Sequence, residues 1–155
     1  MRSKTNFVAP TLYTEKVGVG PDVVLVHGWG MHSGVWTDVA VALRERYRVT
    51  VLDLPGHGYS PSSASRHSLQ DLTSALLAVA PATATWVGWS LGGLAVQQLA
   101  LVAPERVERL VLTNSTPCFV QRPDWPHAVA QPLLRRFAEE LRQDYCTVLK
   151  RFIAL

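Results

Sequence analysis

The chain has 155 residues, of which 48% are hydrophobic and 17% are charged, and its formal net charge is +3. These values are those of a globular protein long enough for one domain, which buries roughly two thirds of its unfolded surface. No apolar run reaches the roughly 18 residues of a membrane span, and residues 1–10 lack the apolar core of a signal peptide. We therefore expect a soluble, cytoplasmic protein that does not act on membranes.

The cysteine content and the charge exclude further classes of protein. Cys118 and Cys146 are too few and too far apart for a disulfide framework or a metal cluster, so we expect free thiols and predict no metal or cofactor. The modest positive charge permits an acidic partner. Because no basic stripe is interleaved with aromatic residues, we expect no nucleic-acid binding.

The first third of the chain alternates predicted strands and helices. A strand is expected over 11–16, and the breaker cluster VGVGP at 17–21 separates it from VVLV at 23–26. Such a continuous aliphatic run is typical of a strand that is buried on both faces of a parallel sheet. Residues 33–47 carry large apolar side chains at helical spacing, and 48–54 form the next predicted strand.

The alternation continues after a serine-rich loop at residues 61–67. Ser68 and Asp71 form a capping-box pattern for a helix over 69–80. The next predicted elements are a strand over 84–89, a helix over 91–103 and a strand over 107–114. Strands that alternate with helices of this length predict an α/β fold, with a parallel sheet and helices on both faces.

The pattern changes near residue 118. Prolines at 117, 123, 126 and 132 exclude a long helix before residue 133, whereas 133–155 predicts one helix with a broad apolar face. We interpret 1–117 as the core of the fold and 118–155 as the start of a helical lid. The apolar face fits a pocket lining or plain core packing, and the arginines among acidic residues fit a solvated face or a docking surface for an acidic partner.

The segment GWSLGG at residues 88–93 carries the clearest chemical signal. Ser90 lies between a predicted strand and a predicted helix, where the pattern Gly-x-Ser-x-Gly forces the serine into a strained turn and exposes its hydroxyl. Gly88 and Gly92 leave room for strand and helix to approach, and the Leu91 N–H points toward an oxyanion formed by attack on a carbonyl. The alternative is a glycine-rich turn without chemistry ahead of a helix.

A second segment, HGWG at residues 27–30, follows the buried strand. Its glycine-flanked turn can bring the backbone N–H of Trp29 opposite Leu91, and two such donors would form an oxyanion hole. His27 precedes the nucleophile, whereas the base of this architecture follows it in the chain, so we favour a structural role in pinning the loop.

The motifs HGWG (27–30), DLPGHGYS (53–60) and GWSLGG (88–93), in this order and spacing, resemble the α/β-hydrolase family. The tryptophan in the first and third motifs is similar to that of the esterases that cleave pimeloyl-acyl-carrier-protein methyl ester in biotin synthesis. Further similarity to these esterases lies in STPCF (115–119), DWP (124–126) and RFIAL (151–155). The resemblance runs along nearly the whole chain.

This resemblance implies a serine carboxylesterase that demethylates the pimeloyl ester of acyl-carrier protein. It implies that Ser90 is the nucleophile and that Trp29 and Leu91 supply oxyanion N–H groups and substrate contacts. It further implies that Phe152 begins the part of the lid that lines the acyl pocket. Because the family docks its acidic carrier on lid arginines, Arg142 and Arg151 are candidate docking residues.

The same resemblance implies that the chain stops inside the lid at Leu155, before the two strands whose loops carry the triad acid and the histidine base. None of His32, His57, His67 and His127 matches the base position. Loss of a triad histidine can cost about a millionfold in kcat. The last predicted strand would also lack its outer neighbour, so we expect an open aliphatic edge and a marginally stable chain.

Three functions therefore stay open. The first is the methyl ester esterase, here a truncated chain without its triad acid and base. The second is a general short-chain carboxylesterase, because pocket shape decides acyl length and alcohol. The third is a non-catalytic remnant that binds an acyl chain or the carrier protein.

Overall fold

The computed structural model describes residues 11–62 and 68–154. The chain divides into two compact units, Met1–Ser115 and Thr116–Leu155. The expected helix cap Ser68 and every expected strand lie in the described ranges. Most of the serine-rich loop and His67 lie outside them.

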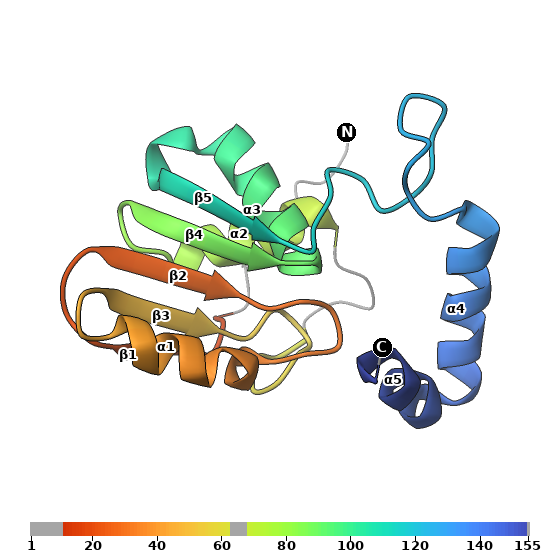
Figure 1. Cartoon of the computed structure of the whole chain (residues 1–155), viewed down its shortest axis with the longest axis horizontal. Coiled ribbons are helices and arrows are strands. Elements are labelled where there is room, and N and C mark those ends of the chain that lie inside the picture. The colour runs from red at the N-terminus through yellow and green to blue at the C-terminus, as the bar shows by residue number, and fades with distance from the viewer. Residues whose placement is uncertain (1–10, 63–67, 155) are drawn as a thin grey trace, which may run out of the picture. The chain divides into compact units, whose positions relative to one another are not determined.

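The first unit is built on one five-stranded sheet (Figure 1). Its strands are β1 (Thr14–Val17), β2 (Asp22–Val26), β3 (Arg48–Leu52), β4 (Ala84–Trp89) and β5 (Val107–Thr113). The order across the sheet is β1-β3-β2-β4-β5, and all neighbours are parallel except β1, which runs antiparallel to β3. The α/β prediction is confirmed, with one antiparallel edge strand added to the expected parallel sheet.

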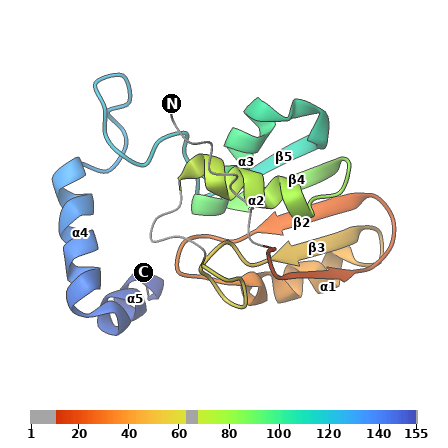
Figure 2. The same cartoon turned by 180° about the vertical axis from the view of Figure 1, so that it is seen from behind.

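Helices cover both faces of this sheet, as Figures 1 and 2 show from opposite sides. On one face, α2 (Leu69–Val79) and α3 (Leu91–Val102) pack against alternate residues of the central strands. The core on this face includes Val24, Val26, Leu52, Leu76, Trp86, Val96 and Leu99. On the other face, α1 (Thr37–Leu43) covers a smaller cluster formed by Val23, Leu25, Trp36, Ala40, Val49 and Val51.

The helix expected over 33–47 is shorter than predicted. The segment begins as a 3-10 turn over Ser33–Trp36, and α1 proper ends at Leu43. Sheet register explains the early end, because Arg48 has to pair with Asp22 at the start of β3. The Arg48 guanidinium binds the Asp22 carboxylate, with Nε 2.7 Å from Oδ1, and its backbone N–H donates to the carbonyl of Pro21.

The other local predictions for the first unit agree with the structure to within about one residue at most ends. The capping box is present, since the Ser68 hydroxyl accepts from the Asp71 N–H at 3.1 Å and the Asp71 carboxylate accepts from the Ser68 N–H at 2.8 Å. The strand and helix around Ser90 occupy Ala84–Trp89 and Leu91–Val102. The edge strand β5 exposes Leu110, Val111 and Leu112 by 37–47%, as expected for an aliphatic edge.

The second unit begins with an irregular loop and ends in two helices, α4 (Gln131–Gln143) and α5 (Tyr145–Ile153). The prediction of one continuous helix over 133–155 is wrong. Asp144 takes an extended φ of −147° and uses its carboxylate to accept the N–H of Thr147, so it caps α5 instead of continuing α4. Short polar side chains such as aspartate favour this cap over a helix interior.

In the part of the chain that the structure describes, no helix combines the length and the apolar character needed to cross a membrane.

Candidate active site

Ser90 lies between β4 and α3 in a backbone conformation that side chains rarely adopt. Its φ is 53° and its ψ is −114°. Among the described residues, Asn114 is the only other non-glycine residue with a positive φ. Such a conformation costs on the order of 1–3 kcal/mol and persists where surrounding contacts enforce it. The strained turn expected from the sequence is therefore present.

Two glycines make the tight turn possible. A methyl group on Gly88 would lie 2.5 Å from the Cα of Gly93, and one on Gly92 would lie 2.5 Å from the carbonyl oxygens of Val26 and His27. These distances are shorter than any real contact, so a side chain at either position would separate α3 from the sheet. The prediction that Gly88 and Gly92 let the strand and the helix approach closely is confirmed.

The backbone of Ser90 is held from two sides. Its N–H donates to the carbonyl of Thr113 at 3.0 Å, which ties it to the end of β5. Its carbonyl accepts from the N–H of Leu94 at 3.1 Å and from the hydroxyl of Ser115 at 2.9 Å. The predicted nucleophile is thus anchored to both its own helix and the neighbouring strand.

The loop after β2 lies next to this turn. A methyl group on Gly28 would be 3.2 Å from the Cβ of Ser90, which places the loop containing Trp29 beside the predicted nucleophile. Gly30 has a φ of 75°, and the N–H of Met31 donates to the carbonyl of Gly28 at 3.3 Å, which closes a tight turn. The structure brings together the two segments on which an oxyanion hole was predicted.

His27 pins this loop, as the sequence analysis favoured. Its side chain is fully buried, its Nδ1 lies 2.7 Å from the carbonyl of Gly28, and its Nε2 accepts the N–H of Leu54 at 2.9 Å. These partners require the neutral tautomer with the proton on Nδ1. Burial lowers the pKa of His27 to about 4, so the ring stays neutral near pH 7.

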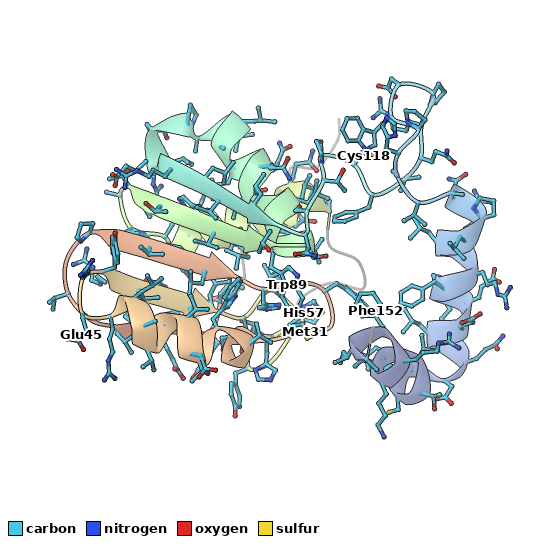
Figure 3. All side chains as sticks on the ribbon, viewed as in Figure 1. Met31, Glu45, His57, Trp89, Cys118 and Phe152 are labelled. Atoms are coloured by element: carbon cyan, nitrogen blue, oxygen red, sulfur yellow. The ribbon has the colours of Figure 1, made fainter. Side chains whose placement is uncertain are left out.

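Asp53 holds the same end of the sheet, a role that the motif DLPGHGYS did not reveal by itself. The carboxylate is buried and accepts the N–H of Ser33 at 2.5 Å and that of Tyr59 at 2.8 Å. Burial alone would raise the pKa of Asp53, but these hydrogen bonds outweigh it and hold the pKa below its ordinary value. Figure 3 shows Trp89, His57 and Met31 at this carboxyl-terminal end of the strands.

Among the described residues, no hydrogen bond reaches the hydroxyl of Ser90. The described histidines are engaged with other groups: His32 Nδ1 accepts from Gly34, His57 Nδ1 lies 3.0 Å from the carbonyl of Pro55, and His127 packs edge-on against Trp125.

A hollow of about 300 Å³ in the first unit lies between β1 and α1. It is lined by Tyr13, Tyr59, Val41 and Val51 among others, and Ser90 is not part of its lining. It therefore does not define the site of the predicted chemistry.

In the second unit, Phe152 lines a separate hollow of about 470 Å³ between α4 and α5. Phe152 is labelled in Figure 3. Its ring lies 5.8 Å from that of Phe137, and its side chain is 40% exposed. Val148 is the one buried hydrophobic residue among those described in this unit. Apolar side chains of both helices, among them Leu134, Phe137 and Val148, line this hollow.

The two candidate docking arginines differ in their surroundings. Arg151 forms an ion pair with Glu140 at 2.5 Å, and Arg136 binds the other oxygen of the same carboxylate at 2.9 Å. These hydrogen bonds, from Arg136 first and Arg151 second, hold the pKa of Glu140 below its ordinary value. Arg142 is exposed and has no ion pair among the described residues.

A strained serine between a central strand and a helix, beside a glycine turn that follows another central strand, is the arrangement of the nucleophile turn in α/β-hydrolases. A sequence profile described as alpha/beta hydrolase fold matches residues 21–143, and the chain belongs to this family.

Curated proteins that share one specific name are similar to this chain in sequence. The chain is 47% identical to "Pimeloyl-[acyl-carrier protein] methyl ester esterase" of Nitrosomonas europaea, over 94% of this chain and 57% of that protein. It is 46% identical to the protein of the same name from Methylococcus capsulatus, over 93% of this chain and 56% of that protein. The chain therefore spans somewhat more than half the length of these relatives.

Similar solved structures have diverse activities. An esterase from Exiguobacterium antarcticum matches with a TM-score of 0.84 and 26% identity, over 91% of this chain and 55% of that one. A bromoperoxidase from Bacillus anthracis matches with a TM-score of 0.82 and 28% identity, over 91% and 54%. A shared fold that supports such different reactions does not identify the substrate.

Proposed function

We propose that this chain carries the nucleophile and part of the oxyanion hole of a serine carboxylesterase, and that its substrate is the methyl ester of pimeloyl-acyl-carrier protein in biotin biosynthesis. The observation that carries the proposal is the strained Ser90 turn beside the Gly28 loop. The names of the relatives at 46–47% identity support the substrate.

In the proposed reaction, the Oγ of Ser90 attacks the ester carbonyl carbon while a base takes its proton. The negative charge that develops on the carbonyl oxygen is stabilised by the N–H groups of Leu91 and Trp29. The tetrahedral intermediate collapses to an acyl-serine and releases methanol. Water then attacks the acyl-serine and frees the pimeloyl carboxylate, still attached to its carrier.

The proton acceptor is the missing part of this scheme. No described histidine is hydrogen-bonded to Ser90, and we propose that the acid and the base belong to the part of the relatives' length that this chain does not cover. Reading the gene beyond the codon for Leu155 tests this directly. An open frame that encodes an aspartate and then a late histidine would support the proposal, and a stop codon would favour a remnant or a two-chain enzyme.

We propose further that the unit Thr116–Leu155 begins the lid of this enzyme. Its apolar face, which includes Phe152, would then line the acyl pocket. Arg142 and Arg151 would attract the acidic carrier protein.

The direct test of the proposed function is labelling and hydrolysis by the protein made from its whole open reading frame. We expect a fluorophosphonate to label Ser90 and pimeloyl-acyl-carrier-protein methyl ester to be demethylated, and we expect Ser90→Ala to abolish both. Equal rates on simple short-chain esters would favour the general carboxylesterase. Carrier binding that survives Ser90→Ala, without hydrolysis by the unmodified protein, would establish the non-catalytic alternative.

A further inference from the structure

The two strained residues of the first unit lie at neighbouring strand ends. Ser90 follows β4 and has a φ of 53°, and Asn114 follows β5 and has a φ of 48°. Trp89 and Thr113 pair at the ends of these parallel strands. Asparagine tolerates this conformation better than most residues, so the chain can leave β5 abruptly at this point.

Ser115 follows immediately, and its side chain connects the two turns. Its hydroxyl donates to the carbonyl of Ser90 at 2.9 Å, while the N–H of Ser90 donates to the carbonyl of Thr113 at 3.0 Å. The Nε2 of Gln97 lies 3.5 Å from the Ser115 oxygen and donates to the carbonyl of Gly93 at 3.1 Å. The end of β5 thus holds the backbone of Ser90 on both sides of its Cα.

The carbonyl of Ser90 and the N–H of Leu91 belong to one peptide group. Because a trans peptide is planar, its C=O and N–H point in opposite directions, and fixing one fixes the other. The helical bond from Leu94 also reaches the Ser90 carbonyl, but carbonyls at helix surfaces can tilt while keeping one bond. A second donor from another element removes that freedom.

We infer that Ser115 is a positioning residue, which orients the Leu91 N–H toward the oxyanion by anchoring the Ser90 carbonyl. This inference deepens the proposed function and rests on it for its catalytic consequence. The Ser115 hydroxyl bonds the backbone carbonyl of Ser90 and not its side chain. This bond sets the direction of a donor whose stabilisation of the transition state depends on alignment.

The structural part of the inference is tested without any reaction. Ser115→Ala removes the donor, and Ser115→Cys keeps nearly the same size but offers only a weak donor. We expect ¹⁵N relaxation of the Leu91 amide to show greater mobility in both variants. Thr73→Val is the matched control, since it removes another partly buried hydroxyl hydrogen bond to a backbone carbonyl, that of Leu69 within α2, and Thr73 has no hydrogen bond to Ser90. Unchanged relaxation at Leu91 in both Ser115 variants would overturn the inference.

The catalytic part is tested by kinetics of the protein made from its whole open reading frame. We expect both Ser115 variants to lower kcat about tenfold, less than the hundredfold or more that follows complete loss of an oxyanion donor, with KM changed less than about twofold. Affinity for a trifluoromethyl ketone, which forms an oxyanion on Ser90, should fall by a similar factor. Thr73→Val should change neither quantity.

The possible failures are distinguishable. If the unmodified protein neither reacts with fluorophosphonate nor cleaves esters, the proposed function fails, while the Leu91 relaxation still decides whether Ser115 holds the peptide. If the unmodified protein is active and both Ser115 variants retain its kcat, the positioning role fails and the proposed function stands. If Ser115→Ala lowers kcat but Ser115→Cys does not, the effect arises from packing and not from the hydrogen bond. That result would also overturn the inference.

Discussion

The units Met1–Ser115 and Thr116–Leu155 are stabilised in different ways. The first encloses residues such as Leu25, Leu52 and Trp86, whose exposure is zero, and its polar groups at the strand ends are bonded across long stretches of sequence. The second has Val148 as its single buried hydrophobic residue among those described, and is held by ion pairs and caps. Strain can be stored only where packing enforces it, which is why the two non-glycine residues with a positive φ among those described both occur in the first unit.

The largest expected difference between the units follows from core truncation. Trp86→Ala removes a fully buried side chain and the hydrogen bond from its Nε1 to the carbonyl of Arg106, so we expect the free energy of unfolding to fall by about 3–5 kcal/mol. The matched change Phe137→Ala, in the half-buried face of α4, should cost about 1 kcal/mol. Urea unfolding followed by circular dichroism measures both. Equal losses would show that the second unit has a core comparable to the first.

Acid should weaken the first unit through His27. The folded pKa, about 4, lies below the ordinary value of 6.5, so the unfolded chain takes up a proton first as the pH falls. The contribution of neutral His27 to the free energy of unfolding is fully present above pH 6.5. It is lost progressively as the pH falls to about 4, and the total loss is about 3 kcal/mol. Asp53, whose folded pKa is lowered, adds a further loss only below the ordinary carboxyl range.

The measurement is urea unfolding between pH 7.5 and 4, with His27→Gln as the variant that cannot titrate. We expect the variant to be less stable at pH 7.5 and nearly independent of pH above 5. Glu140 and Asp144 of the second unit have lowered pKa values, so their protonation reduces stability only at a lower pH than the protonation of His27 does. A pH dependence between 6.5 and 5 that survives His27→Gln would contradict the assignment.

Sequence patterns predicted what depends on local chemistry. Aliphatic runs located β2 and β5, the capping box located α2, and Gly-x-Ser-x-Gly located the strained serine. These features arise from residues within a few positions of one another, so their signal is contained in short stretches of sequence.

Contacts that join distant segments could not be predicted in this way. The hydrogen bond of Ser115 to Ser90 spans 25 residues, and that of Asp53 to Ser33 spans 20. The break at Asp144 was also missed, because the apolar periodicity continues across it and hides the cap. Serine and aspartate are common in loops for many reasons, so their type alone does not reveal their partner.

Relief of backbone strain gives a smaller effect that is specific to the first unit. Ser90→Gly lets the turn adopt its φ of 53° without penalty, but the glycine also gains freedom in the unfolded chain. With a strain of about 1–3 kcal/mol and a glycine cost of about 0.5–1 kcal/mol, we expect a net stabilisation of about 1 kcal/mol. Asn114→Gly should gain less, since asparagine tolerates this region. A loss of stability on Ser90→Gly, measured by urea unfolding, would show that the turn is not strained.

The smallest expected effects lie on the exposed face of the second unit and concern binding of an acidic carrier protein. Arg136 and Arg151 share the single negative charge of Glu140, whereas Arg142 has no ion pair among the described residues. Arg142→Gln should therefore weaken carrier binding more than Arg151→Gln, by about two- to fivefold at low salt, because exposed charges contribute at most about 1 kcal/mol. Glu140→Gln should strengthen binding by releasing both of its arginines. Isothermal titration calorimetry of each variant with the carrier at two salt concentrations separates these cases. If Arg151→Gln weakens binding more than Arg142→Gln does, the ion pair with Glu140 does not compete with the carrier. Arg151 then makes the direct contact.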